Sequence, residues 1–184
     1  MFERFSKAAR NAVRDGVQIA GRDHAARVEA EHLLLGILAQ DRAQGTNTPG
    51  TGILVRHAVT TAAAREAIAV ARRRGGLSTA DAEALTGLGI DVDAVVAAVE
   101  HSHGEGALAA AGRRGRPFGW RVPLSPECKR VLQRCLVEVV ERGENTIGDE
   151  HLLLAILRTG GTAADVLTGF GVTYEVVRDS LTKA

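Results

Sequence analysis

Apolar residues follow the same order at two places in the chain. The stretch EHLLLGIL at 31–38 returns as EHLLLAIL at 150–157, an offset of 119 residues. At this offset 5–38 aligns with 124–157 without a gap, and the apolar positions ahead of both stretches follow the i, i+3, i+4, i+7 spacing of one helix face. The pattern predicts an internal repeat. Each copy holds an amphipathic helix followed by a helix that is apolar on most sides.

Helix-start residues support this alignment. Ser6 and Ser125 are good N-caps, and Pro126 suits the first helical position because its missing N–H costs nothing there. Asp149 is expected to cap the second Leu-rich helix, whereas Ala30 is a poor cap at the same place in the first copy. We therefore expect the first Leu-rich helix to have the weaker start.

A further pair of segments aligns at a different offset. LGIDVDAVVAAV at 88–99 matches FGVTYEVVRDSL at 170–181, an offset of 82 residues. The difference between the two offsets, 119 and 82, predicts that the first copy carries 37 additional residues.

Much of this additional segment has a helical pattern. The Ala-rich stretch 53–76 ends in three arginines followed by two glycines, which is typical of a helix C-terminus. Either 50–59 or 80–89 can be the counterpart of 160–171 in the second copy. The sequence leaves these two alternatives open.

The expected fold class is all-α. We predict a single domain with repeat one at 1–100, an insertion within about 41–80, a linker at 101–121 and repeat two at 122–184. Two such copies are expected to pack around a pseudo-twofold axis, because neither can bury its helices well alone. The central side chains should be Leu33, Leu34, Ile37, Leu152, Leu153 and Ile156.

Composition limits the classes of function. The 184 residues carry 23 basic and 22 acidic side chains, and this balance gives no electrostatic drive toward nucleic acid or a membrane. The start MFERFSKAAR has no apolar signal core, and no apolar run approaches the roughly 18 residues of a membrane span. Cys128 and Cys135 lie roughly 10 Å apart if they share one helix, too far for a disulfide. We expect two buried thiols in a cytoplasmic protein.

An acid and a histidine precede each Leu-rich run. Glu31 and Glu150 fit the first turn of a helix, where free N–H groups and the helix dipole favour an acid. His32 and His151 are expected to be buried and to hydrogen-bond the helix start to the neighbouring loop. No cysteine or second histidine stands at helical ligand spacing from either one, so we expect no metal.

Sequence motifs of catalysis are missing. The chain holds no G-x-x-x-x-G-K-[ST] phosphate loop, no G-x-S-x-G and no H-E-x-x-H. We therefore expect neither a cofactor nor an enzymatic activity.

The doubled E-H-L-L-L, with capped helices around it, resembles the amino-terminal domain of Clp/Hsp100 unfoldases, the ClpC type in particular. MFERF at 1–5 and VPLSPECKRVL at 122–132 are similar to the starts of the two repeats in that family. The resemblance covers 1–38 and 88–184. Those unfoldases continue into ATPase modules, and this sequence has none, so we expect a stand-alone recognition domain.

The resemblance implies two kinds of site. In ClpC-type domains the glutamate of each repeat helps bind phosphoarginine, the tag on proteins marked for degradation, which implies Glu31 and Glu150 here. The alternative is that both are helix-start residues only. Asp149 would repel a phosphate beside Glu150, so the first repeat is expected to bind more tightly.

The second implied site is an apolar surface where adaptor proteins and cyclic peptide antibiotics dock. The matching residues are Phe2, Val13, Leu124, Lys129 and Leu132. Phe2 is equally well explained as a staple on the first helix.

The expected function is non-catalytic recognition of a peptide, tagged substrate or adaptor for Clp-dependent proteolysis, or sequestration of ligands of the Clp unfoldase. The expected partners are thus a Clp unfoldase, an adaptor or a peptide, and neither nucleic acid nor a membrane. The rival hypothesis is an enzyme or regulator that has borrowed the fold, with the insertion as its functional part.

Overall fold

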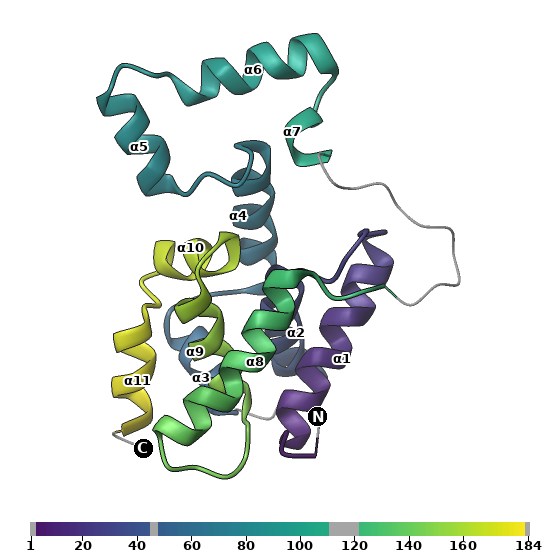
Figure 1. Ribbon diagram of the computed structural model, residues 1–184, viewed down its shortest axis with the longest axis vertical. Helices are drawn as coiled ribbons and strands as arrows, with labels where there is room; N and C mark the ends of the chain where they lie inside the picture. Colours follow the sequence, from purple (N-terminus) through teal and green to yellow (C-terminus); the bar gives the residue numbers. More distant parts are fainter. Residues whose placement is uncertain (1–2, 45–47, 111–121, 183–184) are drawn as a thin grey trace.

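The computed structural model describes residues 3–44, 48–110 and 122–182. The described part is helical, with no strand and two isolated β-bridges, which confirms the expected all-α class (Figure 1). The helices are α1 (Lys7–Arg22), α2 (Ala30–Gln44), α3 (Pro49–Arg56), α4 (Thr61–Arg73), α5 (Thr79–Gly87), α6 (Val92–His103), α7 (Ala107–Ala110), α8 (Pro126–Glu141), α9 (Asp149–Thr159), α10 (Thr162–Gly169) and α11 (Tyr174–Thr182).

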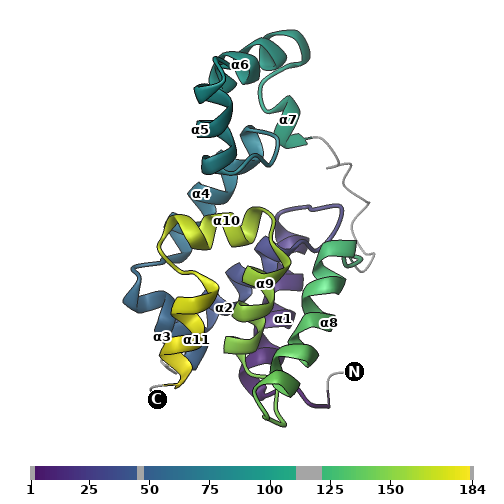
Figure 2. The same cartoon turned by 60° about the vertical axis from the view of Figure 1, so that its left-hand side comes forward.

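Most of these helices gather into one body. Helices α1, α2, α8 and α9 run side by side, and α3, α10 and α11 cover their other flank (Figures 1 and 2). Helix α4 leads away from this body to α5, α6 and α7, which lie apart at one end.

Two reciprocal backbone contacts join the repeats. The Ser6 N–H donates to the Ile147 carbonyl over 2.8 Å, and the Ser125 N–H donates to the Val28 carbonyl over 3.0 Å. Both the donors and the acceptors are related by the 119-residue offset. The start of each repeat is therefore pinned to the loop of the other, as a twofold relation requires. The predicted pseudo-twofold packing is confirmed.

The Leu-rich helices α2 and α9 form the centre of the core. They contact each other, while α1 packs on α2 and α8 packs on α9. The six side chains predicted to be central are fully buried: Leu33, Leu34, Ile37, Leu152, Leu153 and Ile156.

One difference between the two Leu-rich stretches has a steric cause. Gly36 in the first copy corresponds to Ala155 in the second. A Cβ at Gly36 would overlap the backbone carbonyl oxygen of Ala12, and one at Gly16 would lie 2.7 Å from the His32 carbonyl oxygen. Helices α1 and α2 therefore approach too closely for a side chain at these two positions, and glycine is required.

Helices α3 and α4 fill the place that α10 and α11 fill in the second repeat. Helix α3 packs on α9 and α2, as α10 packs on α2 and α9; α4 packs on α2 and α10, as α11 packs on α9 and α3. Ile53 and Leu54 are buried in the main core. These contacts favour 50–59 over 80–89 as the counterpart of 160–171.

The helices that stand outside the main core are therefore α5, α6 and α7. They do not coincide with the insertion predicted within about 41–80. Helices α5 and α6 bury a small cluster of their own, made by Ala82, Val92 and Val96. The helical pattern at 53–76 is divided between two helices, and the second ends at the arginines as expected. Helix α3 ends at Arg56, and Thr60 starts α4 by accepting a hydrogen bond from the Ala63 N–H (3.1 Å).

The predicted linker at 101–121 begins within a helix, because α6 continues to His103 and is followed by α7. Positions 111–121 lie outside the described residues. Both cysteines are buried in α8, as expected. None of the described helices alone is long and apolar enough to span a membrane; α9 and α10 together pass by length and composition, but they are bent by 104°.

Candidate functional site

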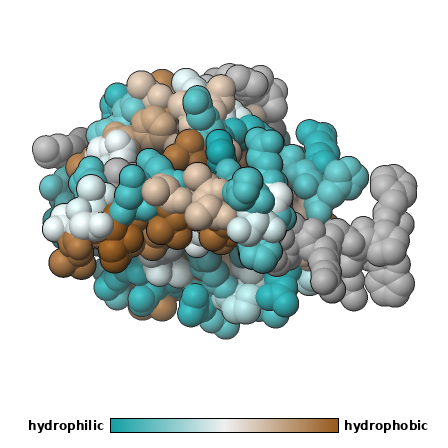
Figure 3. Space-filling model, turned by 90° about the horizontal axis from the view of Figure 1, so that it is seen from above, coloured by the Kyte–Doolittle hydropathy of each residue, from teal (hydrophilic) through white to brown (hydrophobic). Residues whose placement is uncertain are grey.

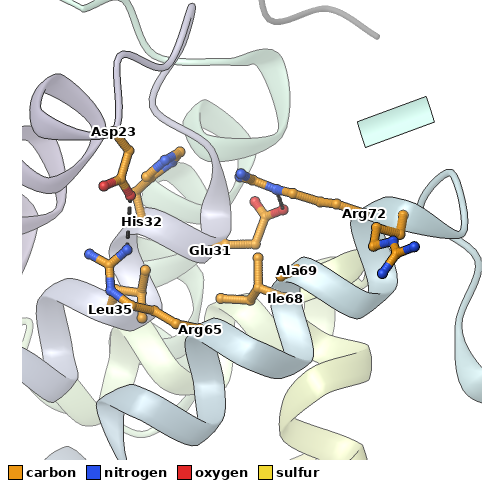
Figure 4. Close-up of a pocket in the computed structure, with 9 residues that line it drawn as sticks. Asp23, Glu31, His32, Leu35, Arg65, Ile68, Ala69 and Arg72 are labelled. Atoms are coloured by element: carbon orange, nitrogen blue, oxygen red, sulfur yellow. Dashed lines mark hydrogen bonds and ion pairs between the residues drawn. The ribbon is translucent and has the colours of Figure 1, made fainter. Parts of the chain in front are cut away.

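Glu31, the second residue of α2, lies in a pocket of about 430 Å³ between α2 and α4 (Figure 4). Its side chain is almost fully buried, as expected for the first turn of a central helix. Helix α4 supplies most of the opposite wall. The lining residues are Asp23, Glu31, His32, Leu35, Arg65, Ile68, Ala69, Arg72 and Arg73.

The carboxylate of Glu31 is already paired with a guanidinium. The Nε of Arg72 lies 3.4 Å from Oε1 of Glu31, and Figure 4 shows the Arg72 side chain extending from α4 across the pocket. A second pair, Arg65 with Asp23, has an N–O distance of 3.1 Å at the other side of the pocket. The pocket therefore holds charges of both signs within reach of one ligand.

Sequence reasoning missed the contribution of α4 to this pocket, because 53–76 was assigned to the insertion and its arginines to a helix end. A signal was present. Arg65, Ile68, Ala69 and Arg72 follow the i, i+3, i+4, i+7 spacing of one helix face, and all four line the pocket. The sequence did not show that this face of α4 packs against α2.

Glu150, the counterpart of Glu31, has different neighbours. Its Oε1 lies 3.0 Å from Nδ1 of His151, and its side chain is largely buried. Burial alone would raise the pKa of Glu150, but its own backbone hydrogen bond and the positive charge that the His151 ring carries when protonated outweigh burial, so the pKa lies below its ordinary value. Glu150 is therefore held as a carboxylate, with a histidine rather than an arginine beside it.

Asp149 does not cap its own helix, contrary to prediction. The helix begins at Asp149 itself, with Gly148 as its N-cap. The Asp149 carboxylate instead accepts hydrogen bonds from the Thr48 hydroxyl and the Thr51 N–H at the start of α3. Burial raises the pKa of Asp149 to about 6; the Thr48 hydrogen bond opposes this rise, and the charge of Glu150 adds to it. The Asp149 carboxylate is therefore held by hydrogen bonds from the start of α3.

The two histidines hold the helix starts, as predicted. Nδ1 of His32 accepts from the Glu29 N–H (2.9 Å), and Nδ1 of His151 accepts from the Gly148 N–H (3.0 Å). Both rings are buried. Each histidine thus satisfies one of the N–H groups that a helix leaves unpaired at its start, in the manner of a capping box.

This hydrogen bond also bears on metal binding. Glu144, Glu150 and His151 bring ligand atoms within 4.8 Å of one another. Because Nδ1 of His151 is an acceptor, the ring proton lies on Nε2, which faces Glu144 at 3.3 Å. A metal on that side needs an unprotonated Nε2, so the arrangement disfavours metal binding.

The residues of the implied apolar surface differ in exposure. Val13 and Leu132, equivalent positions on α1 and α8, are buried. Leu124 is partly buried and Lys129 is exposed, both at the start of α8. Phe2 lies outside the described residues. The accessible part of this surface, as far as the structure describes it, is therefore built around Leu124 and Lys129.

A comparison with protein families shows which family the chain belongs to. It matches the Clp repeat (R) N-terminal domain family over residues 68–170 and 123–184, and it belongs to this family. In Clp chaperones this domain is a non-catalytic module that binds substrates and adaptors.

Several curated proteins are similar along almost the whole chain. The chloroplastic chaperone protein ClpC1 of Arabidopsis thaliana is 29% identical over 179 residues, which is 97% of this chain and 14% of that protein. The chloroplastic ClpA homolog of Brassica napus is also 29% identical, over 97% of this chain and 15% of its own length. The chain therefore spans about a seventh of these relatives.

Two solved structures share the fold. One is the N-terminal domain of the chaperone ClpD from Arabidopsis thaliana, with a TM-score of 0.53, 21% identity, and coverage of 100% of this chain and 96% of that one. The other is the Hsp104 N-terminal domain from Candida albicans, with a TM-score of 0.55, 10% identity, and coverage of 97% and 89%.

Proposed function

We propose that this protein is a non-catalytic receptor that binds arginine-phosphorylated substrates, or adaptors that carry substrates, and presents them to a Clp unfoldase. The two glutamates at the starts of α2 and α9 are the guanidinium-binding groups in this proposal. A cytoplasmic location belongs to the same proposal, and the two buried thiols are compatible with it.

The pairing of Arg72 with Glu31 is the observation that carries the proposal. It places a guanidinium 3.4 Å from a largely buried carboxylate, inside a pocket large enough for a side chain. A carboxylate and a guanidinium form strong, directional pairs, and Glu31 is oriented for one. A phosphoarginine guanidinium would take the place of Arg72.

The rest of the pocket suits the phosphate. Arg65 and Arg73 also line it, and both side chains are about half exposed. Arginine is the residue best matched to phosphate oxygens, because its planar fork donates two parallel hydrogen bonds. The pocket thus offers a carboxylate for the guanidinium and, once they leave Asp23 and Glu100, two arginines for the phosphoryl group.

Calorimetry with phosphoarginine tests this function. Wild type should release heat on titration, Glu31→Gln and Glu150→Gln should each lose part of it, and the double variant should lose all of it. Arginine without the phosphoryl group is the control ligand and should bind more weakly. If neither wild type nor a variant freed of Arg72 binds phosphoarginine, the proposal is wrong.

A second candidate function is sequestration of Clp unfoldase ligands, cyclic peptide antibiotics included. Partly exposed Leu124 and exposed Lys129, five residues apart around the start of α8, supply an apolar and a cationic group for it. Leu124→Asp should then abolish binding of a cyclic peptide and leave phosphoarginine binding unchanged. Retained cyclic peptide binding in this variant would exclude the surface.

A further inference from the structure

Helices α5 and α6 form a hairpin that stands apart from the main core. Their own buried cluster is small: Ala82, Val92 and Val96, with Leu77, Leu85 and Leu108 packed against it. Figures 1 and 2 show the hairpin held out at the end of α4. With so few buried side chains, α5 and α6 bury little of their apolar surface against each other.

The uncovered side chains lie together in sequence at the turn between α5 and α6. Leu88 is 78% exposed, Ile90 43% and Val95 52%. Figure 3, which views this end of the molecule from above, shows a band of apolar surface across it. Contiguous apolar surface of this kind marks an interaction site more often than an accident of composition.

The second repeat shows what such a face does when it is covered. Segment 88–99 aligns with 170–181, so Ile90 corresponds to Val172 and Val95 to Val177. Val172 and Val177 are both 0% exposed, because α10 and α11 pack on the Leu-rich helix α9. The same pattern is thus a helix-binding face in α10–α11 and is left without a helix in α5–α6.

The charge of the segment that carries this face favours a basic partner. From Gly75 to Leu108 the chain has six acids and neither lysine nor arginine: Asp81, Glu83, Asp91, Asp93, Glu100 and Glu105. Two of them are paired from α4, Asp93 with Arg74 (3.3 Å) and Glu100 with Arg73 (3.4 Å). The other four form no ion pair with a described lysine or arginine, so the segment that carries this face keeps a net negative charge. A second copy of the hairpin would bring like charges together, whereas a basic segment would be attracted.

We propose that Leu88, Ile90 and Val95 form a docking surface for an amphipathic helix of another protein, with an apolar stripe that covers these residues and lysines or arginines at its edges. The apolar stripe takes the position that α9 takes against α10 and α11. The basic flanks pair with the acids that α4 leaves free. This surface is separate from the Glu31 pocket and does not depend on its function.

The test uses the whole chain and a fluorescently labelled amphipathic helical peptide of leucine and lysine, followed by anisotropy. Replacing Leu88, Ile90 and Val95 together by serine should weaken binding by about tenfold or more, as expected for the centre of an interface. The matched control replaces three exposed apolar side chains of the main body by serine: Val55 (53%), Val137 (40%) and Val140 (69%). This control should bind the peptide as wild type does.

A second peptide, with glutamate in place of every lysine, tests the charge argument. It should bind more weakly than the lysine peptide, and high salt should reduce the difference. The proposal is overturned if both triple variants bind alike or if the two peptides bind alike. It is also overturned if sedimentation shows that wild type is a dimer and that the variant with serine at Leu88, Ile90 and Val95 is a monomer, since the face would then serve self-association.

Discussion

The guanidinium of Arg72 lies 3.4 Å from the carboxylate of Glu31, inside the pocket formed by α2 and α4. Glu31 and Glu150 are equivalent in sequence, but only Glu31 has an arginine within ion-pair distance in the described part of the chain. The protein therefore supplies its own guanidinium at one of the two positions where a tagged substrate is proposed to bind. The Arg72 pair would compete with a ligand at the first repeat, so it opposes the effect expected from Asp149; that the first repeat binds more tightly stays a prediction.

Removing Arg72 is expected to strengthen phosphoarginine binding at the first repeat. Arg72→Met keeps the aliphatic part of the side chain and frees the Glu31 carboxylate. Since partly exposed ion pairs contribute up to about 1 kcal/mol, the affinity should rise by about fivefold. Calorimetry of Arg72→Met in the Glu150→Gln background isolates this site.

The control for this prediction is Arg74→Met, two residues further along. It removes the same charge from a side chain that pairs with Asp93 and does not line the pocket. Equal affinities of the Arg72→Met and Arg74→Met variants would show that Arg72 does not compete with the ligand.

The stability of the fold should depend on pH through Asp149. Its pKa is raised to about 6 by burial, above its ordinary value of 3.8. A raised pKa means that the folded state binds the proton more tightly, so this stabilisation is present below pH 4 and is lost as pH rises through 6. Relative to Asp149→Asn, wild type should lose up to about 3 kcal/mol between pH 4 and pH 7.

Urea unfolding of both proteins across this pH range measures the effect. Asp179→Asn, the same substitution at an exposed position, is the control. A difference between wild type and Asp149→Asn that stays constant with pH would contradict the prediction.

The close approach of α1 and α2 predicts opposite effects for two glycines of these helices. Gly36→Ala introduces a methyl group against the Ala12 carbonyl and should destabilise the protein by about 2–3 kcal/mol. Gly21→Ala, in α1, meets no atom within 4 Å and should stabilise it by up to about 1 kcal/mol through helix propensity. Urea midpoints compare the two, and equal effects would mean that α1 can move away from α2.

The two thiols are expected to be unreactive in the folded protein. Burial raises the pKa of Cys128 to about 12 and raises that of Cys135 further. Since the thiolate is the reactive form, iodoacetamide at neutral pH should label neither until urea is added. Val137→Cys, exposed on the same helix, should be labelled at once. Rapid labelling of wild type would show that α8 opens readily.

Local features of the sequence were enough to establish the repeat. The doubled EHLLL, the caps at Ser6 and Ser125 and the spacing of apolar residues predicted two central helices, and those helices are buried as expected. These are properties of short segments, where helix caps and amphipathic periodicity act within a few turns. The structural role of His32 and His151 was predictable for the same reason.

The sequence could not decide which segment completes the first repeat, nor what stands opposite Glu31. Segments 50–59 and 80–89 both have the pattern of α10, and a helical pattern specifies an apolar face without naming the surface that it covers. One space beside α2 receives α3 and α4, and this choice brings Arg72 to Glu31 and leaves Leu88, Ile90 and Val95 exposed. Such a choice depends on contacts between residues far apart in the chain, so only the tertiary structure decided it.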